Sequence, residues 1–145
     1  MSPKWMTSLV RARQLQEEAA KQSLATAQRE VISAQEQIRY NCERIDSLVA
    51  ADAQDSAPAF VAAAVALQAA AATHSYSVAC AAQAAQQVLA RRDDLGAAAR
   101  ARRTAEEIEQ RVQATELHLA ALAAQRDLDE VAARISRDLH TGARS

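Results

Sequence analysis

Glycine and proline are scarce in this sequence. Only two residues of each occur among 145, and the glycines stand far apart at positions 96 and 142. Phosphate-binding loops of the G-x-x-x-x-G-K-[ST] type and the dinucleotide motif G-x-G-x-x-G need several closely spaced glycines. Both motifs are therefore excluded. The same scarcity favours long helices, because glycine and proline are the residues that weaken or break them.

Large side chains are also few. Aromatic residues make up 3 % of the chain, whereas roughly a quarter of it is alanine, far above average usage. A rounded core needs large apolar side chains to bury enough surface, and this chain has few to offer. The composition instead predicts an all-α fold in which helices pack along thin alanine seams.

Residues that carry catalysis or bind metals are isolated from one another. The two cysteines lack metal-ligand spacing, and the three histidines form no H-E-x-x-H motif and no triad. Two pairs of adjacent carboxylates fall on expected exposed helix faces, without the enclosed setting that tunes a catalytic acid. We therefore predict no enzyme activity, no cofactor, no metal and no small-molecule substrate. The residues considered are Cys42, Cys80, His74, His118, His140, Asp93, Asp94, Asp129 and Glu130.

No excess of charge of one sign is present. The chain has 17 basic and 18 acidic residues and a formal net charge of -1. A nucleic-acid-binding rod that used Arg91-Arg92 and Arg100–Arg103 is conceivable, but the balanced charge argues against it. We also expect neither a membrane span of about 20 residues nor a signal peptide, which predicts a cytoplasmic protein.

Heptad spacing predicts a first helix over about residues 3–50. An early apolar stripe is expected at Trp5, Leu9, Ala12 and Ala19. From there apolar residues recur in an a/d pattern, with Asn41 as a polar interruption that fixes register. The a/d positions are Leu24, Val31, Ile38 and Ile45 with Ala20, Ala27, Ala34, Asn41 and Leu48. Charged pairs at i,i+4, such as Glu17–Lys21 and Arg39–Glu43, are expected on the solvated face.

A second, longer helix is predicted over about residues 58–140. Residues 51–57 break the first pattern, and Pro58 suits the first turn of a new helix. The new seam steps by seven, with small residues four positions on, and His74 is expected partly buried in it. Its positions are Phe60, Leu67, His74, Ala81, Val88 and Leu95 with Ala64, Ala71, Val78 and Ala85. The short connection makes the two helices antiparallel neighbours.

The pattern as a whole predicts one elongated domain over residues 1–145, a long two-helix antiparallel coiled-coil hairpin with a frayed tail at 141–145. If the chain reverses near residue 54, position 42 faces about 66, and the two cysteines lie too far apart for a disulfide. The first helix then ends opposite about residue 105. About 35 residues of the second helix overhang with an exposed apolar stripe, which indicates a binding partner.

Two stretches resemble the flagellar FliJ family of the bacterial type III export apparatus. The first runs from Leu9 to Ala20, L-V-R-A-R-Q-L-Q-E-E-A-A, and continues through the alanine and valine positions that follow. The second is R-D-L-D-E-V-A-A-R, from Arg126 to Arg134. The resemblance implies a stalk that binds the hexameric export ATPase, promotes its assembly, and contacts the membrane export gate and export chaperones.

The resemblance also implies particular surfaces. Arg126, Leu128, Asp129 and Glu130 are the candidate ATPase-binding residues, and Tyr40, Phe60 and Leu67 are the candidate export-gate contacts. The protein would then lie in the cytoplasm, peripheral to the cytoplasmic face of the inner membrane. Two other readings stay open from sequence: a self-assembling structural coiled coil and a stalk homologue of a non-flagellar type III secretion system.

Overall fold

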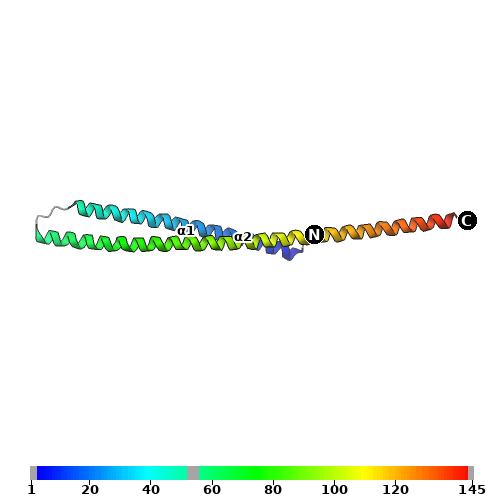
Figure 1. Ribbon diagram of the computed structural model, residues 1–145, viewed down its shortest axis with the longest axis horizontal. Coiled ribbons are helices and arrows are strands. Elements are labelled where there is room, and N and C mark those ends of the chain that lie inside the picture. The colour runs from blue at the N-terminus through cyan, green and yellow to red at the C-terminus, as the bar shows by residue number, and fades with distance from the viewer. Residues whose placement is uncertain (1–2, 52–55, 144–145) are drawn as a thin grey trace. The chain divides into compact units, whose positions relative to one another are not determined.

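The computed structural model describes residues 3–51 and 56–143, and almost all of them are helical. Helix α1 spans Lys4–Ala50 and helix α2 spans Ala57–Gly142 (Figure 1). The expected all-α hairpin of two long helices is confirmed, and α2 continues through Gly96 without a break. Ser2, residues 52–55 of the expected turn and the last two residues of the expected tail lie outside the described residues.

Local sequence accounts for the start of each helix. The Pro3 carbonyl accepts hydrogen bonds from the backbone N–H groups of Met6 and Thr7, which begins α1. At α2 the Ser56 hydroxyl accepts a hydrogen bond from the N–H of Ala59 at 3.3 Å. Serine is a favoured helix cap because its side chain satisfies one of the free N–H groups at the helix start. Pro58 lies in the first turn of α2, as predicted.

The chain divides into two compact units, and the first combines Met1–Gln14 with Arg100–Ser145. Its core consists of Met6, Val10 and Ala105, which are all buried. The Thr7 hydroxyl donates to Glu109 at 3.5 Å and the Gln14 amide donates to Glu106 at 3.5 Å. Here the start of α1 therefore runs antiparallel to α2.

This first unit corrects the expected early stripe. Trp5 is 63 % exposed and Ala12 is exposed too, whereas Met6 and Val10 face α2 and Leu9 is half-buried. Ala19, which belongs to the second unit, is also exposed. Buried positions on α1 alternate by four and three residues from the start of the helix, and this phase excludes Trp5.

The second unit, Leu15–Ala99, contains the antiparallel pairing of the main parts of α1 and α2. The face of α1 that packs on α2 is the predicted one. Its members are buried or half-buried at Ala20, Leu24, Ala27, Val31, Ala34, Ile38, Asn41, Ile45 and Leu48. The predicted ion pairs Lys21–Glu17 and Arg39–Glu43 are present at 3.6 and 3.8 Å.

On α2 the predicted seam is only half right. His74, Ala81, Val88 and Leu95 are half-buried as expected, but Phe60 and Leu67 are exposed. The companion positions are exposed as well, at Ala64, Ala71, Val78 and Ala85. The residues that face α1 lie one position earlier. We call the following set the inner seam: Ala63, Ala70, His74, Ser77, Ala81, Ala84 and Val88.

The pairing register also differs from the one expected. Asn41 is bonded to Ser77 and Cys42 lies against His74, so position 42 faces about 75 rather than 66. A buried amide needs a hydrogen-bonding partner, and Ser77 supplies it only in this register. The end of α1 therefore faces about residue 67, and residues 57–66 of α2 extend beyond it.

One stretch of α2 bears on the expectation that the chain has no membrane span. By length and composition alone α2 could cross a membrane, since one 18-residue stretch of it reaches a mean hydropathy of 1.3 and only 6 % of that stretch is buried. Alanine raises this average without large apolar side chains. A high mean hydropathy is only weak evidence for a membrane span. The same part of α2 is uncharged, since no Asp, Glu, Lys or Arg occurs between Ser56 and Ala90.

Candidate functional site

The interface between α1 and α2 carries a polar cluster in its middle. The Asn41 side-chain amide donates to the Ser77 hydroxyl at 2.6 Å, and both residues are buried. Ser77 in turn donates to the backbone carbonyl of Thr73 at 3.0 Å. Sequence reasoning found Asn41 but missed Ser77, because the companion positions of the seam were assigned one residue too late.

Both cysteines are free thiols, as predicted. The Cys42 sulfur lies 3.7 Å from Nδ1 of His74, on one side of the interface. Cys80 is six residues beyond His74, about 9 Å along α2 and nearer than the predicted register implies. Cys80 instead hydrogen-bonds to the exposed Tyr76. That bond and the negative charge of an ionised Cys80 raise the pKa of the Tyr76 phenol.

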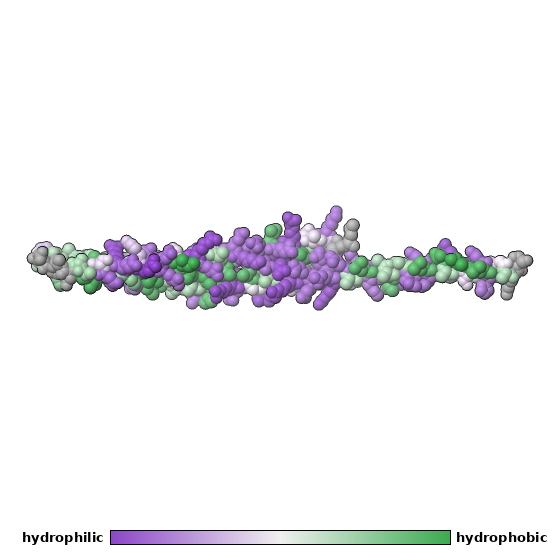
Figure 2. Space-filling model, turned by 90° about the horizontal axis from the view of Figure 1, so that it is seen from above, coloured by the Kyte–Doolittle hydropathy of each residue, from purple (hydrophilic) through white to green (hydrophobic). Residues whose placement is uncertain are grey.

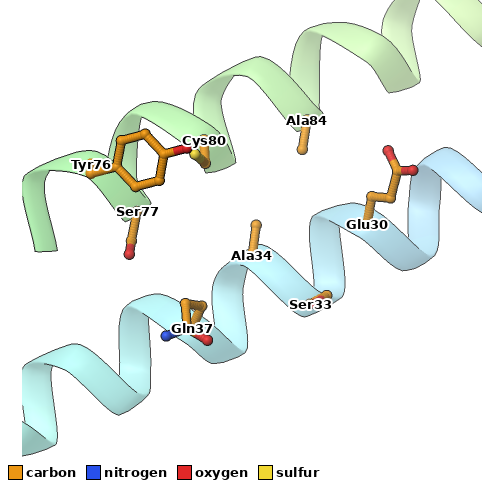
Figure 3. Close-up of a pocket in the computed structure, with 8 residues that line it drawn as sticks. All are labelled: Glu30, Ser33, Ala34, Gln37, Tyr76, Ser77, Cys80 and Ala84. Carbon is orange, nitrogen blue, oxygen red and sulfur yellow. The ribbon is translucent and has the colours of Figure 1, made fainter. Parts of the chain in front are cut away.

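A shallow groove of about 370 Å³ runs along this part of the interface, on the side of Tyr76 and Cys80 (Figure 3). Its lining comes from both helices: Glu30, Ser33, Ala34 and Gln37 of α1 with Tyr76, Ser77, Cys80 and Ala84 of α2. The groove is open and its one charged side chain is acidic. Among the residues that the structure describes, no group of three His, Cys, Asp or Glu could hold a metal ion.

The more distinctive feature is the last part of α2. Every residue from 117 to 143 is exposed, and we call residues 117–142 the terminal segment. Within its unit it continues past the start of α1, since Thr7 already bonds Glu109. At 1.5 Å per residue the terminal segment is about 39 Å long, somewhat shorter than predicted because the register is shifted.

The terminal segment has an apolar face. Apolar residues alternate by four and three positions along it, and we call them the apolar stripe: Leu117, Ala121, Ala124, Leu128, Val131 and Ile135. The larger members are between 51 % and 73 % exposed. Figure 2 shows hydrophobic surface along this part of the chain. A helix that keeps such a stripe uncovered has the surface of a binding element.

The four candidate ATPase residues are all exposed, but they do not share one face. At 100° per residue Arg126 and Glu130 each lie about 160° from Leu128, and Asp129 lies about 100° from it. Only Leu128 belongs to the apolar stripe. Glu130 forms an ion pair with Arg134 at 2.5 Å, and Asp129 accepts a hydrogen bond from Gln125 at 3.0 Å.

The three candidate export-gate residues are exposed but not gathered together. Tyr40 is 58 % exposed, Phe60 60 % and Leu67 37 %. Phe60 and Leu67 are two turns apart on α2, whereas Tyr40 is on α1 next to the residue that bonds Ser77. Tyr40 therefore lies at about the level of Ser77, which is 17 residues from Phe60. The two aromatic residues are about 25 Å apart along the helix axis.

These features define a class of protein: a two-helix coiled coil whose distinctive parts are binding surfaces. A family model described as flagellar FliJ protein matches residues 3–138. The chain therefore belongs to the flagellar FliJ family, which places it in flagellar protein export and flagellum biogenesis. Searches of curated proteins and of solved structures gave no match.

Proposed function

We propose that this protein is a stalk of the flagellar export apparatus and that its terminal segment binds the export ATPase. The observation that carries the proposal is the apolar stripe on a helix that is exposed from residue 117 to 143. A helix with an uncovered stripe fits a groove formed by other helices or a central channel of a ring. Arg126, Leu128, Asp129 and Glu130 fall on this segment.

The different faces of the segment suggest different roles. Leu128 and its stripe supply apolar contact area, whereas Arg126, Glu130 and Arg134 form a charged face on the other side. An element that enters a ring meets subunits all round, so one apolar and one charged face are both useful there. Binding several subunits at once would bias the ATPase toward its assembled hexamer.

The remaining contacts follow from family membership. The part of the hairpin near the turn, with Tyr40, Phe60 and Leu67, is proposed to meet the export-gate membrane protein, and the rod as a whole to associate with export chaperones. The protein would work at the cytoplasmic face of the inner membrane without catalysing a reaction. The family match favours the flagellar system over a non-flagellar secretion system.

Co-purification with the export ATPase of the same genome tests the proposal. The full chain is compared with a chain that ends at residue 120, which keeps every described residue that packs between α1 and α2. We expect the full chain to retain the ATPase and the shortened chain to lose it, with helical content per residue unchanged by circular dichroism. Equal retention by both chains would exclude the terminal segment as the binding site.

A further inference from the structure

A second seam on α2 is left uncovered. Moving each inner-seam position on by one residue gives Ala64, Ala71, Ser75, Val78, Ala82, Ala85 and Leu89. Together with Phe60 and Leu67 on the same face, these nine residues form what we call the outer seam. All nine residues are exposed, and the larger ones strongly so, with Phe60 at 60 %, Val78 at 46 % and Leu89 at 52 %. One residue is about 100° of helix rotation, so the outer seam faces about a right angle away from α1.

The outer seam has the spacing of a coiled-coil interface. Its positions are three or four residues apart over about four heptads, a length of about 44 Å, with two consecutive steps of four on either side of Ala71. Its flanks are uncharged, because no Asp, Glu, Lys or Arg occurs from Ser56 to Ala90. A helix with two apolar seams at a right angle is suited to the corner of a bundle, where it packs on two neighbouring helices.

We propose that the outer seam pairs two copies of this chain, antiparallel, about a two-fold axis near His74 and Ser75. Eight of the nine positions form four pairs about that point, so each of the eight meets a position of the same seam on the partner copy, and Ser75 lies at the axis itself. Phe60 then lies opposite Leu89, and the small Ala71 lies opposite Val78. Because Phe60 and Leu67 are also the candidate export-gate contacts, the dimer and the gate would compete for them. A surface that complements itself in this way is what a two-fold dimer requires.

The charge and the side-chain sizes of the outer seam both favour a second copy as its partner. Pairing this segment with itself buries no charged side chain and brings no like charges together, which removes the usual cost of a self-contact. In the middle of the seam Leu67 faces Ala82 and Ala64 faces Ala85, so a large residue meets a small one or two small residues approach closely, and only the two ends pair large residues, Phe60 with Leu89. The two α1 helices then lie on the same face of the α2 pair, and the two hairpins form a four-helix bundle.

The dimer makes a specific prediction for the native cysteines. Cys42 contacts His74, so it lies beside the two-fold axis and next to Cys42 of the second copy. Cys80 lines the groove on the opposite side of the hairpin. Mild oxidation is therefore expected to join two chains through Cys42, with loss of two protons and two electrons to the added oxidant. Cys80→Ser leaves this cross-link intact and Cys42→Ser abolishes it.

Sedimentation equilibrium of the full chain tests the proposal directly. We expect a dimer at about 10–100 μM, a concentration at which weak specific interfaces are occupied. Ala71→Glu places an unpaired carboxylate in the interface and should raise the dimer dissociation constant at least about tenfold. Ala69→Glu, on an exposed face away from both seams, is the matched control and should leave the constant unchanged.

A rescue variant separates this contact from a general loss of folding. Residue 71 faces residue 78 of the other copy, so Ala71→Glu combined with Val78→Lys creates two opposite-charge pairs and should restore the dimer. Circular dichroism of each variant reports whether the hairpin remains helical. A native chain that stays monomeric, or a dimer that survives Ala71→Glu, would overturn the proposal. Neither result bears on ATPase binding by the terminal segment.

Discussion

A buried amide fixes how the two helices align. Asn41 takes a position that an apolar residue would otherwise fill, and its hydrogen bond to Ser77 is the shortest link between the helices, at 2.6 Å. Sliding one helix by a heptad would separate the two groups and leave a polar atom buried without a partner. That cost is larger than the gain from one hydrogen bond, so the pair acts mainly against wrong registers.

A double-mutant cycle on Asn41→Ala and Ser77→Ala measures this contact. Each single variant is expected to lower the free energy of unfolding by about 1–2 kcal/mol, and the coupling between them should be about 1 kcal/mol. Urea unfolding followed by circular dichroism gives both quantities. Additive effects would mean that the two side chains are not bonded in solution.

At Tyr76 the structure makes a prediction about pH. The phenol keeps its proton to higher pH than an ordinary tyrosine, because its hydroxyl bonds Cys80 and because an ionised Cys80 repels the phenolate. In a Tyr40→Phe background, Cys80→Ala should therefore lower the pKa of Tyr76, which an absorbance titration of the phenolate would record. Cys42→Ala serves as the control, since Cys42 contacts His74 instead and should leave the titration unchanged.

At the scale of the helices, the phase of each seam decides what is buried. Ala70 is 5 % exposed and faces α1, while Ala69 and Ala71 on either side of it are exposed. Leucine at position 70 has no room and must push the helices apart. We expect Ala70→Leu to lower the free energy of unfolding by about 1–3 kcal/mol.

The neighbouring variant Ala69→Leu provides the comparison, with an expected change within about 0.5 kcal/mol. Thermal or urea unfolding at low protein concentration measures both. If Ala70→Leu were tolerated as well as Ala69→Leu, position 70 would not face α1. The seam predicted from the sequence, which turns Ala71 inward, would then be the correct one.

Much of this organisation is readable from the sequence. Both helices and the packing face of α1 from Ala20 onward follow from heptad spacing, and the terminal segment follows from helix lengths. Heptad spacing does not show which residues of α2 face α1, because α2 has two adjacent seams, each made of alanine and a few larger residues. Phe60 and Leu67 drew the prediction to the outer seam, whereas the Asn41–Ser77 bond, the Cys42–His74 contact and the burial of Ala70 identify the inner one.

The same limit applies to the candidate sites. Arg126, Leu128, Asp129 and Glu130 came from a family resemblance, and a linear motif does not say that its residues lie on different faces of one helix. Tyr40 was grouped with Phe60 because both are aromatic and near the turn. The shifted register places them about 25 Å apart along the helix axis.

For the whole molecule, the two units expose different surfaces. In one unit the terminal segment exposes the apolar stripe, and in the other α2 exposes the outer seam. Neither surface packs against another part of the described chain. Substitutions on either surface should therefore leave the hairpin folded. A stalk that binds an ATPase through one surface and a second copy through another would join two binding events in one protein.

The affinity of the full chain for the export ATPase is the measurement that tests the central claim most directly. Leu128→Glu/Ile135→Glu places two charges in the apolar stripe, while Ala123→Glu/Ala133→Glu places two charges about 140° away from it on the same segment. We predict that the stripe variant raises the dissociation constant at least about tenfold, a loss of about 1.4 kcal/mol, and that the control, which lies on the charged face, raises it less. Native affinity in the stripe variant would show that the terminal segment does not bind the ATPase through this face.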